Sequence, residues 1–113
     1  MSAIEGEGYR VFHDADANRV VFEGAVRLGG MGEYAPITDM LGSALENGGA
    51  VTVDVRGLEF LNSSGIAVLS KFVIQARNRQ DVNLSIVGAA QVPWQNKSLN
   101  NLQRLMPAIA RSP

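Results

Sequence analysis

Two adjacent hydroxyl residues, Ser63 and Ser64, follow Asn62 and precede Gly65 in the stretch FLNSSGIAVLSKF, residues 60–72. A serine in such a place has three chemical uses. It can cap the start of a helix, attack a substrate as a nucleophile, or accept a phosphate group. Capping by Asn62 or Ser63 accounts for one of these polar side chains and leaves the others to be explained.

A nucleophilic role for Ser64 lacks the residues that it needs. The strand-to-helix turn that exposes a catalytic serine requires glycine two positions before it and two positions after it. Asn62 and Ile66 stand at those positions instead. An activated serine also needs a general base within hydrogen-bond reach, and the only histidine, His13, lies in another segment near the amino terminus. We therefore predict no catalytic residue and no enzymatic activity.

The composition restricts the remaining classes. The 113 residues are 46% apolar and 19% charged, which is typical of one globular domain, expected here over residues 1–113 with a core at about 8–106. A net charge of −1 gives no overall attraction to nucleic acid or to an anionic membrane. Cysteine is absent, and the histidine and carboxylates lack metal-ligand spacing, so we expect no cofactor and no metal.

The sequence also bears on location. No apolar run reaches the length of a membrane span, so we expect no direct membrane insertion. The first ten residues, MSAIEGEGYR, are acidic and do not resemble a secretory signal. We therefore expect a cytoplasmic protein.

Alternating β-prone and helical segments predict an α/β fold. Residues 9–13 and 19–23 predict an antiparallel hairpin, joined by the turn-forming residues DADAN. Apolar residues at helical spacing predict three helices, over 34–46, from the serines to about 79, and between Pro93 and Pro107.

Two apolar runs complete the expected sheet. AVTVDV and VNLSIV predict buried strands over 50–55 and 82–87, with a short turn between the first of these and residue 60. The expected element order is therefore β-β-α-β-α-β-α. It implies a mixed, mostly parallel sheet with helices packed on it.

The helix that begins at the serines has two faces when it is drawn at about 100° per residue. The face expected to pack on the sheet contains Gly65, Ile66, Leu69, Phe72, Val73 and Ala76. The outer face contains Ser64, Ala67, Val68, Lys71, Gln75 and Asn78. We therefore expect Ser64 to be exposed, and Gly65 to let the helix approach the sheet closely.

The combined pattern VTVDVRGLEFLNSSGIAVL, residues 51–69, resembles the signature of STAS domains, and in particular that of bacterial anti-sigma factor antagonists. In that family an apolar strand ending in Asp is followed by an apolar linker, an acidic residue, two hydroxyl residues and a glycine that opens a helix. The resemblance implies a STAS-like fold and a non-enzymatic module that binds proteins. The family is phosphorylated on the hydroxyl residue directly before the glycine, which is Ser64 here, with Ser63 as the alternative.

The resemblance also implies partners. They would be a GHKL-type serine kinase that doubles as the anti-sigma factor, and a PP2C-type phosphatase that resets the switch. The partner-binding residues would be Asn62, Ser63, Ser64, Ala67, Val68, Lys71 and Gln75. This chain departs from the family at Asn62, where Asp is common, so the negative charge beside the serines is lower.

Two other functions remain open. The same fold could be a constitutive scaffold or subunit of a signalling or lipid-transport complex, without phosphorylation. Alternatively, GGMGEYA fits the pattern G-x-G-x-x-A at Gly30, Gly32 and Ala35, and Asp54 follows at a strand end, as in a small-nucleotide site.

The last helix has two interpretations. Its polar side, expected to be exposed, contains Gln95, Asn96, Asn100, Gln103 and Arg104. In the first interpretation the helix is an ordinary amphipathic one, and Trp94 closes the edge of the core. In the second, Trp94, Lys97 and Arg104 form a second contact surface, because tryptophan and arginine often anchor interfaces.

Overall fold

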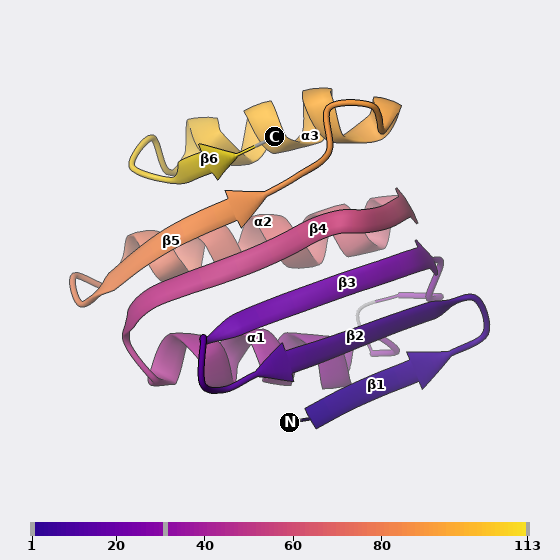
Figure 1. Cartoon of the computed structure of the whole chain (residues 1–113), viewed down its shortest axis with the longest axis horizontal. Helices are drawn as coiled ribbons and strands as arrows, with labels where there is room; N and C mark the ends of the chain where they lie inside the picture. The colour runs from indigo at the N-terminus through magenta and orange to yellow at the C-terminus, as the bar shows by residue number, and fades with distance from the viewer. Residues whose placement is uncertain (1, 31, 113) are drawn as a thin grey trace.

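The computed structural model describes residues 2–30 and 32–112. It contains six strands, β1 (Ser2–Gly6), β2 (Tyr9–Asp14), β3 (Arg19–Val26), β4 (Gly49–Leu61), β5 (Val82–Val87) and β6 (Ala110–Ser112). The three helices are α1 (Ala35–Glu46), α2 (Ser63–Arg77) and α3 (Pro93–Leu105). All six strands form one sheet in the order β1-β2-β3-β4-β5-β6, so each strand lies beside its neighbours in the sequence (Figure 1).

The connections explain why the helices lie together. Strands β1, β2 and β3 pair antiparallel through tight turns, whereas β3, β4, β5 and β6 pair parallel through α1, α2 and α3. Crossovers between parallel strands have one hand, and here they all advance in the same direction across the sheet. They therefore place all three helices on one face of the sheet and leave the other face open (Figure 1).

The predicted α/β class and the antiparallel hairpin are confirmed, whereas the predicted element order and the mostly parallel sheet are not. Strands β1 and β6 flank the seven expected elements, and parallel pairs outnumber antiparallel ones by only three to two. The buried core also reaches past residue 106, because Ile109 is buried. Both added strands are short and carry few apolar side chains, so the sequence gives little sign of them.

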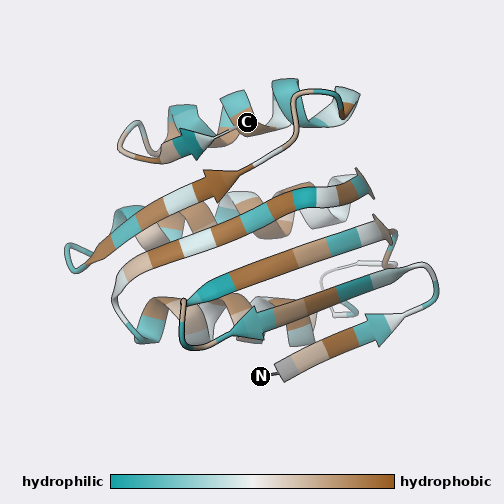
Figure 2. Ribbon diagram, viewed as in Figure 1, coloured by the Kyte–Doolittle hydropathy of each residue, from teal (hydrophilic) through white to brown (hydrophobic). Residues whose placement is uncertain are grey.

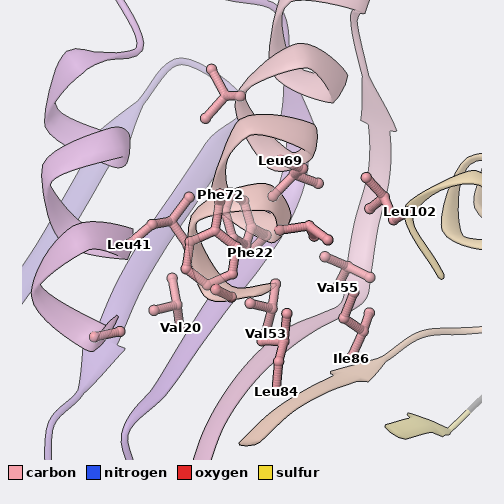
Figure 3. Packing of buried hydrophobic residues seen from close by; sticks show 14 of the residues in the cluster. Val20, Phe22, Leu41, Val53, Val55, Leu69, Phe72, Leu84, Ile86 and Leu102 are labelled. Carbon is pink, nitrogen blue, oxygen red and sulfur yellow. The ribbon is translucent and has the colours of Figure 1, made fainter. Parts of the chain in front are cut away.

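The core fills the space between the sheet and the helices. Side chains from β3, α1, β4, α2, β5 and α3 meet there, among them Val20, Phe22, Leu41, Val53, Leu69, Phe72, Leu84 and Leu102 (Figure 3). On β4 and β5, hydrophobic residues alternate with more polar ones along much of the ribbon (Figure 2). That alternation gives the sheet one buried face, against which the apolar faces of the helices pack.

Strand β4 runs without interruption to Leu61, just before α2, so the short turn predicted before residue 60 is wrong. Its pairing with β3 shifts register twice, first between the pairs Val21–Asp54 and Glu23–Gly57. The extra residue of such a bulge disturbs the alternation of a strand, and both Val55 and Leu58 are buried. Because the alternation is shifted by the bulge, the apolar pattern of the strand breaks off after Val55 in the sequence although the strand continues.

The Gln95 side chain supplies hydrogen bonds to the part of β4 that lies beyond its pairing with β5. The pairing of β4 with β5 ends at Asp54, so the carbonyl groups after it need other donors. The Gln95 Nε2 donates to the carbonyl oxygens of Val55 (2.7 Å) and Leu58 (3.1 Å), and its Oε1 accepts from the Ala89 N–H (2.8 Å). The prediction that Gln95 is exposed is therefore wrong, because its side chain is 1% exposed.

We expect Gln95→Ala to lower the free energy of unfolding by about 3 kcal/mol, because it leaves buried backbone groups without partners. Asn96→Ala is the matched control, since Asn96 is exposed on the same helix, and its effect should stay within about 0.5 kcal/mol. Urea unfolding followed by circular dichroism measures both. Similar losses in the two variants would show that the Gln95 hydrogen bonds contribute little.

Candidate functional site

Asn62 connects three segments at the start of α2. It is the N-cap residue, and its Oδ1 accepts from the Gly65 backbone N–H (3.0 Å) and from the Tyr34 hydroxyl (2.6 Å). Its Nδ2 donates to the Leu28 carbonyl oxygen (2.8 Å). One side chain therefore holds the first turn of α2, the segment before α1 and the loop after β3 together.

The Asn62 amide suits this position better than a carboxylate would. Tyr34 is 1% exposed, and burial raises the pKa of its hydroxyl, so the hydroxyl stays protonated and donates to Asn62. Aspartate would keep both acceptor roles but would place an oxygen against the Leu28 carbonyl, where only a donor fits. The contact with Leu28 therefore requires an amide rather than a carboxylate at position 62.

The two serines occupy the first turn of α2. Ser63 is exposed, whereas Ser64 is half-buried, so Ser64 is less exposed than predicted. Within residues 2–30 and 32–112, neither hydroxyl makes a hydrogen bond to another protein group. The first turn contains no acidic residue. Both hydroxyl groups are therefore chemically uncommitted beside the positive end of a helix.

Val68 was predicted to belong to the partner-binding surface, but it is buried and cannot contact a partner. It is 4% exposed and belongs to the core, because α2 lies between α1 and α3 and both of its flanks are covered. Toward α3, the Arg77 Nη1 donates to the Leu105 carbonyl oxygen (3.1 Å). The exposed residues of α2, which form its crest, are Ser63, Ala67, Lys71, Ile74, Gln75 and Arg77.

Gly65 permits the close packing at the start of α2. It is buried, as predicted, and a Cβ at this position would lie 2.7 Å from the Tyr34 Oη and even closer to the Leu61 side chain. Both neighbours are buried, and the Tyr34 side chain is also held by its hydrogen bond to Asn62. Any side chain at position 65 would therefore push α2 away from the sheet.

A hollow of about 580 Å³ adjoins the same end of the sheet. It is lined by residues 6–9 of the β1–β2 turn and by Ala25, Arg27 and Leu28. The Gly8 carbonyl oxygen accepts from the Ala25 N–H (3.0 Å), which fixes the turn against β3. Because Leu28 is also bonded to Asn62, one wall of this hollow is attached to the start of α2.

The second predicted contact surface consists of Trp94, Lys97 and Arg104, and these residues differ in burial. Trp94 is half-buried, packs against the core, and donates from Nε1 to the Leu58 carbonyl oxygen (3.1 Å). It therefore closes the core edge, as the first interpretation predicted. Lys97 and Arg104 are exposed on α3.

The residues of the nucleotide alternative do not come together. The glycine loop follows Val26, the last residue of β3, whereas Asp54 pairs in the sheet with Val21. Asp54 lies between two core valines in β4 and so points to the open face of the sheet. Its carboxylate is already bound by Arg19 (3.0 Å) and Arg56 (2.7 Å), so it is not placed to bind a ribose.

Comparison of the chain with family models, with curated proteins and with solved structures gives no significant match. The resemblance to STAS domains therefore rests on the motif over residues 51–69. Among the described residues, no helix has both the length and the apolar character needed to cross a membrane.

We expect alanine at two helical glycines to act in opposite directions. Gly42→Ala should raise the free energy of unfolding by about 1 kcal/mol, because nothing lies within 4 Å of the added methyl group and alanine is the better helix former. Gly65→Ala should lower it by about 1–3 kcal/mol through overpacking against Tyr34 and Leu61. Urea unfolding of both variants is the measurement, and stabilisation by Gly65→Ala would contradict the tight approach of α2.

The ion pairs of Asp54 predict how stability responds to acid. Burial alone raises the pKa of Asp54, but hydrogen bonds from Arg56 and Arg19 outweigh it, so the pKa lies below its ordinary value. A lowered folded-state pKa stabilises the fold above the unfolded-state pKa of about 3.9, and this contribution is lost as the pH falls further. Unfolding measured from pH 7 to pH 2.5 should therefore show a steeper acid loss in the parent chain than in Asp54→Asn. Parallel curves would show that Asp54 titrates alike in both states.

Proposed function

We propose that this chain is a non-enzymatic, STAS-type interaction module whose binding to a partner protein is controlled by phosphorylation at the start of α2. The observation that carries the proposal is the pair of uncommitted hydroxyls at Ser63 and Ser64, directly after the capping residue Asn62. The motif over residues 51–69 supports it. From β2 to α3 the elements also follow the order β-β-α-β-α-β-α, with β1 and β6 added at the ends.

A phosphate fits the start of α2 without unfolding it. It would add a charge of roughly −1.5 to −2 at neutral pH. The N–H groups of the first turn and the helix dipole favour an anion there. Because the Asn62 cap is bonded to Leu28 and Tyr34 as well as to Gly65, the first turn has support that does not depend on the serines.

The phosphate would instead weaken the binding of the partner protein. A protein docked on the crest of α2 would cover Ala67, Lys71 and Gln75, and with them the neighbouring serines. Removing a phosphate from water without a compensating partner costs several kcal/mol, by analogy with other buried ions. About 2.7 kcal/mol already corresponds to a hundredfold loss of affinity. Phosphorylation can therefore release the partner with no change in the fold.

Ser64 is the proposed acceptor because it stands directly before Gly65, and Ser63 is the alternative because it is the more exposed. The proposed partners are a GHKL-type serine kinase that serves as anti-sigma factor and a PP2C-type phosphatase. Residues Asn62 and Val68 would support this surface from below, since the first is half-buried and the second is buried.

A second function, a constitutive STAS scaffold in a signalling or lipid-transport complex, is favoured by one observation. Ser64 is half-buried, so a kinase has less access to it than to a fully exposed hydroxyl. In this case the same crest of α2 would bind its partner without regulation.

Phosphorylation is tested by incubating the chain with its kinase and ATP and analysing the peptide of residues 57–77 by mass spectrometry. We expect one phosphate, absent from Ser64→Ala. Ser64→Ala should keep the affinity for the partner, whereas Ser64→Asp should weaken it by about tenfold or more, because it adds charge to the docked surface.

Three further variants control this experiment. If Ser63 is the acceptor, Ser63→Ala should abolish labelling and Ser63→Asp should weaken binding. Asn83→Asp adds a negative charge at an exposed position of β5, between two core residues and so on the sheet face away from the helices, and should leave partner binding nearly unchanged. An unlabelled peptide, together with equal affinities of the aspartate and alanine variants, would favour the constitutive scaffold.

A further inference from the structure

The charges of this chain are divided between its two halves. Residues 1–59 contain ten carboxylates and four arginines, whereas residues 60–113 contain one carboxylate and six lysines or arginines. Because the strands lie in sequence order across the sheet, this division along the chain becomes a division in space. The side with β1, β2, β3 and α1 is acidic, and the side with α2, β5, α3 and β6 is basic (Figure 1).

Four cations form an exposed basic face on the two helices of the second half. They are Lys71 and Arg77 on α2 and Lys97 and Arg104 on α3. Neither helix contains Asp or Glu, and across residues 2–30 and 32–112 none of the four has a carboxylate within 4 Å. The single carboxylate of this half, Asp81, is paired with Arg79.

The two helices that carry these cations lie side by side. Helices α2 and α3 pack against each other and run in the same direction, since each connects two parallel strands. The hydrogen bond from Arg77 to the Leu105 carbonyl brings their carboxyl-terminal ends together. Arg77 therefore lies near Arg104, and Lys71 and Lys97 lie about two turns earlier on each helix. The α3 ribbon is mostly hydrophilic (Figure 2).

We propose that the basic face, Lys71, Arg77, Lys97 and Arg104, is a docking surface for a protein that presents a cluster of Asp and Glu side chains. The inference rests on the proposed function in using the crest of α2, and it adds the chemistry of the partner. Cations without intramolecular carboxylates keep their attraction for an external anion, and complementary charge governs partner choice and the association rate.

A folded acidic protein suits this surface better than a nucleic acid does. Four cations neutralise few phosphates, and the ten carboxylates of the other half repel a long polyanion that extends beyond the two helices. A second copy of this chain would have to dock its acidic side on the basic face. Such a head-to-tail contact generates rings or open filaments, which ultracentrifugation detects.

The basic face also gives a physical route for regulation by the serines. Ser64 lies seven residues before Lys71, which is about 10 Å along the helix axis. The Debye length at physiological ionic strength is about 8 Å, so a phosphate on Ser64 partly cancels the field of the nearest cations. An acidic partner is therefore repelled by the phosphate itself, in addition to the cost of removing the phosphate from water.

The test uses a short glutamate homopolymer as the probe and the unphosphorylated full chain. In low-salt buffer, two-dimensional NMR should show shifts confined to α2 and α3, and binding should weaken as NaCl is raised. The variant Lys71→Gln/Arg104→Gln should bind the probe about tenfold more weakly. The control Ala15→Glu/Ala35→Glu changes the net charge by the same amount at exposed sites on the acidic side, and should change the affinity by about twofold or less.

Four outcomes would overturn the proposal. They are absence of probe binding at low salt, equal weakening in the control, tighter binding of a short DNA duplex than of the glutamate polymer, and self-association in ultracentrifugation that the Lys71→Gln/Arg104→Gln variant abolishes. Ser64→Asp should weaken probe binding by about threefold, and an unchanged affinity would overturn the electrostatic coupling to the serines. No kinase is present in this experiment, so its result is separate from whether Ser64 is phosphorylated.

Discussion

The Asn62 side chain is the contact on which the functional region depends. Strand β4 passes directly into α2, so the first turn of the helix must find partners for its backbone N–H groups within a residue or two. Asn62 supplies one of them and uses its remaining atoms to bind Tyr34 and the loop at Leu28. Leu28 and Tyr34, each more than twenty-five residues before Asn62 in the sequence, are thereby held next to the turn that contains the two serines. Because the amide donates and accepts at once, neither aspartate nor serine can replace all of these contacts.

A second set of hydrogen bonds supports the strand that carries Asn62. The last part of β4 extends past the end of β5, and its carbonyl groups at Val55 and Leu58 are bound instead by Gln95 and Trp94 from the start of α3. The amino-terminal end of α3 thus holds the bulged part of β4, and β4 holds the cap of α2. The positions of α2 and α3 relative to each other are therefore set by buried polar contacts as well as by apolar packing.

The sequence predicted those elements whose signals are local. Strand β5 is found where its apolar run predicted it, and α3 begins at the proline that suits a first helical turn. Strands β1 and β6 are short and are stabilised by pairing with β2 and β5, which no local pattern reveals. Val68 and Gln95 show a second limit. A helical wheel gives the direction of a side chain but not what covers it, and α2 is covered on both flanks while Gln95 enters a gap beside β4.

For the switch proposed at the start of α2, the fixed cap and the divided charge favour an effect through charge over an effect through a change of shape. A switch that moves α2 would have to break the contacts of Asn62, Tyr34 and Gly65, which are buried or half-buried and close-packed. A switch that adds charge at the first turn leaves those contacts in place and acts through the field of the exposed lysines and arginines. Since the strand order turns the uneven charge of the chain into two differently charged sides, such a field exists even though the net charge is only −1. A net charge of −1 therefore conceals an acidic side and a basic side, and the proposed partner would be selected by the charge of the face it meets.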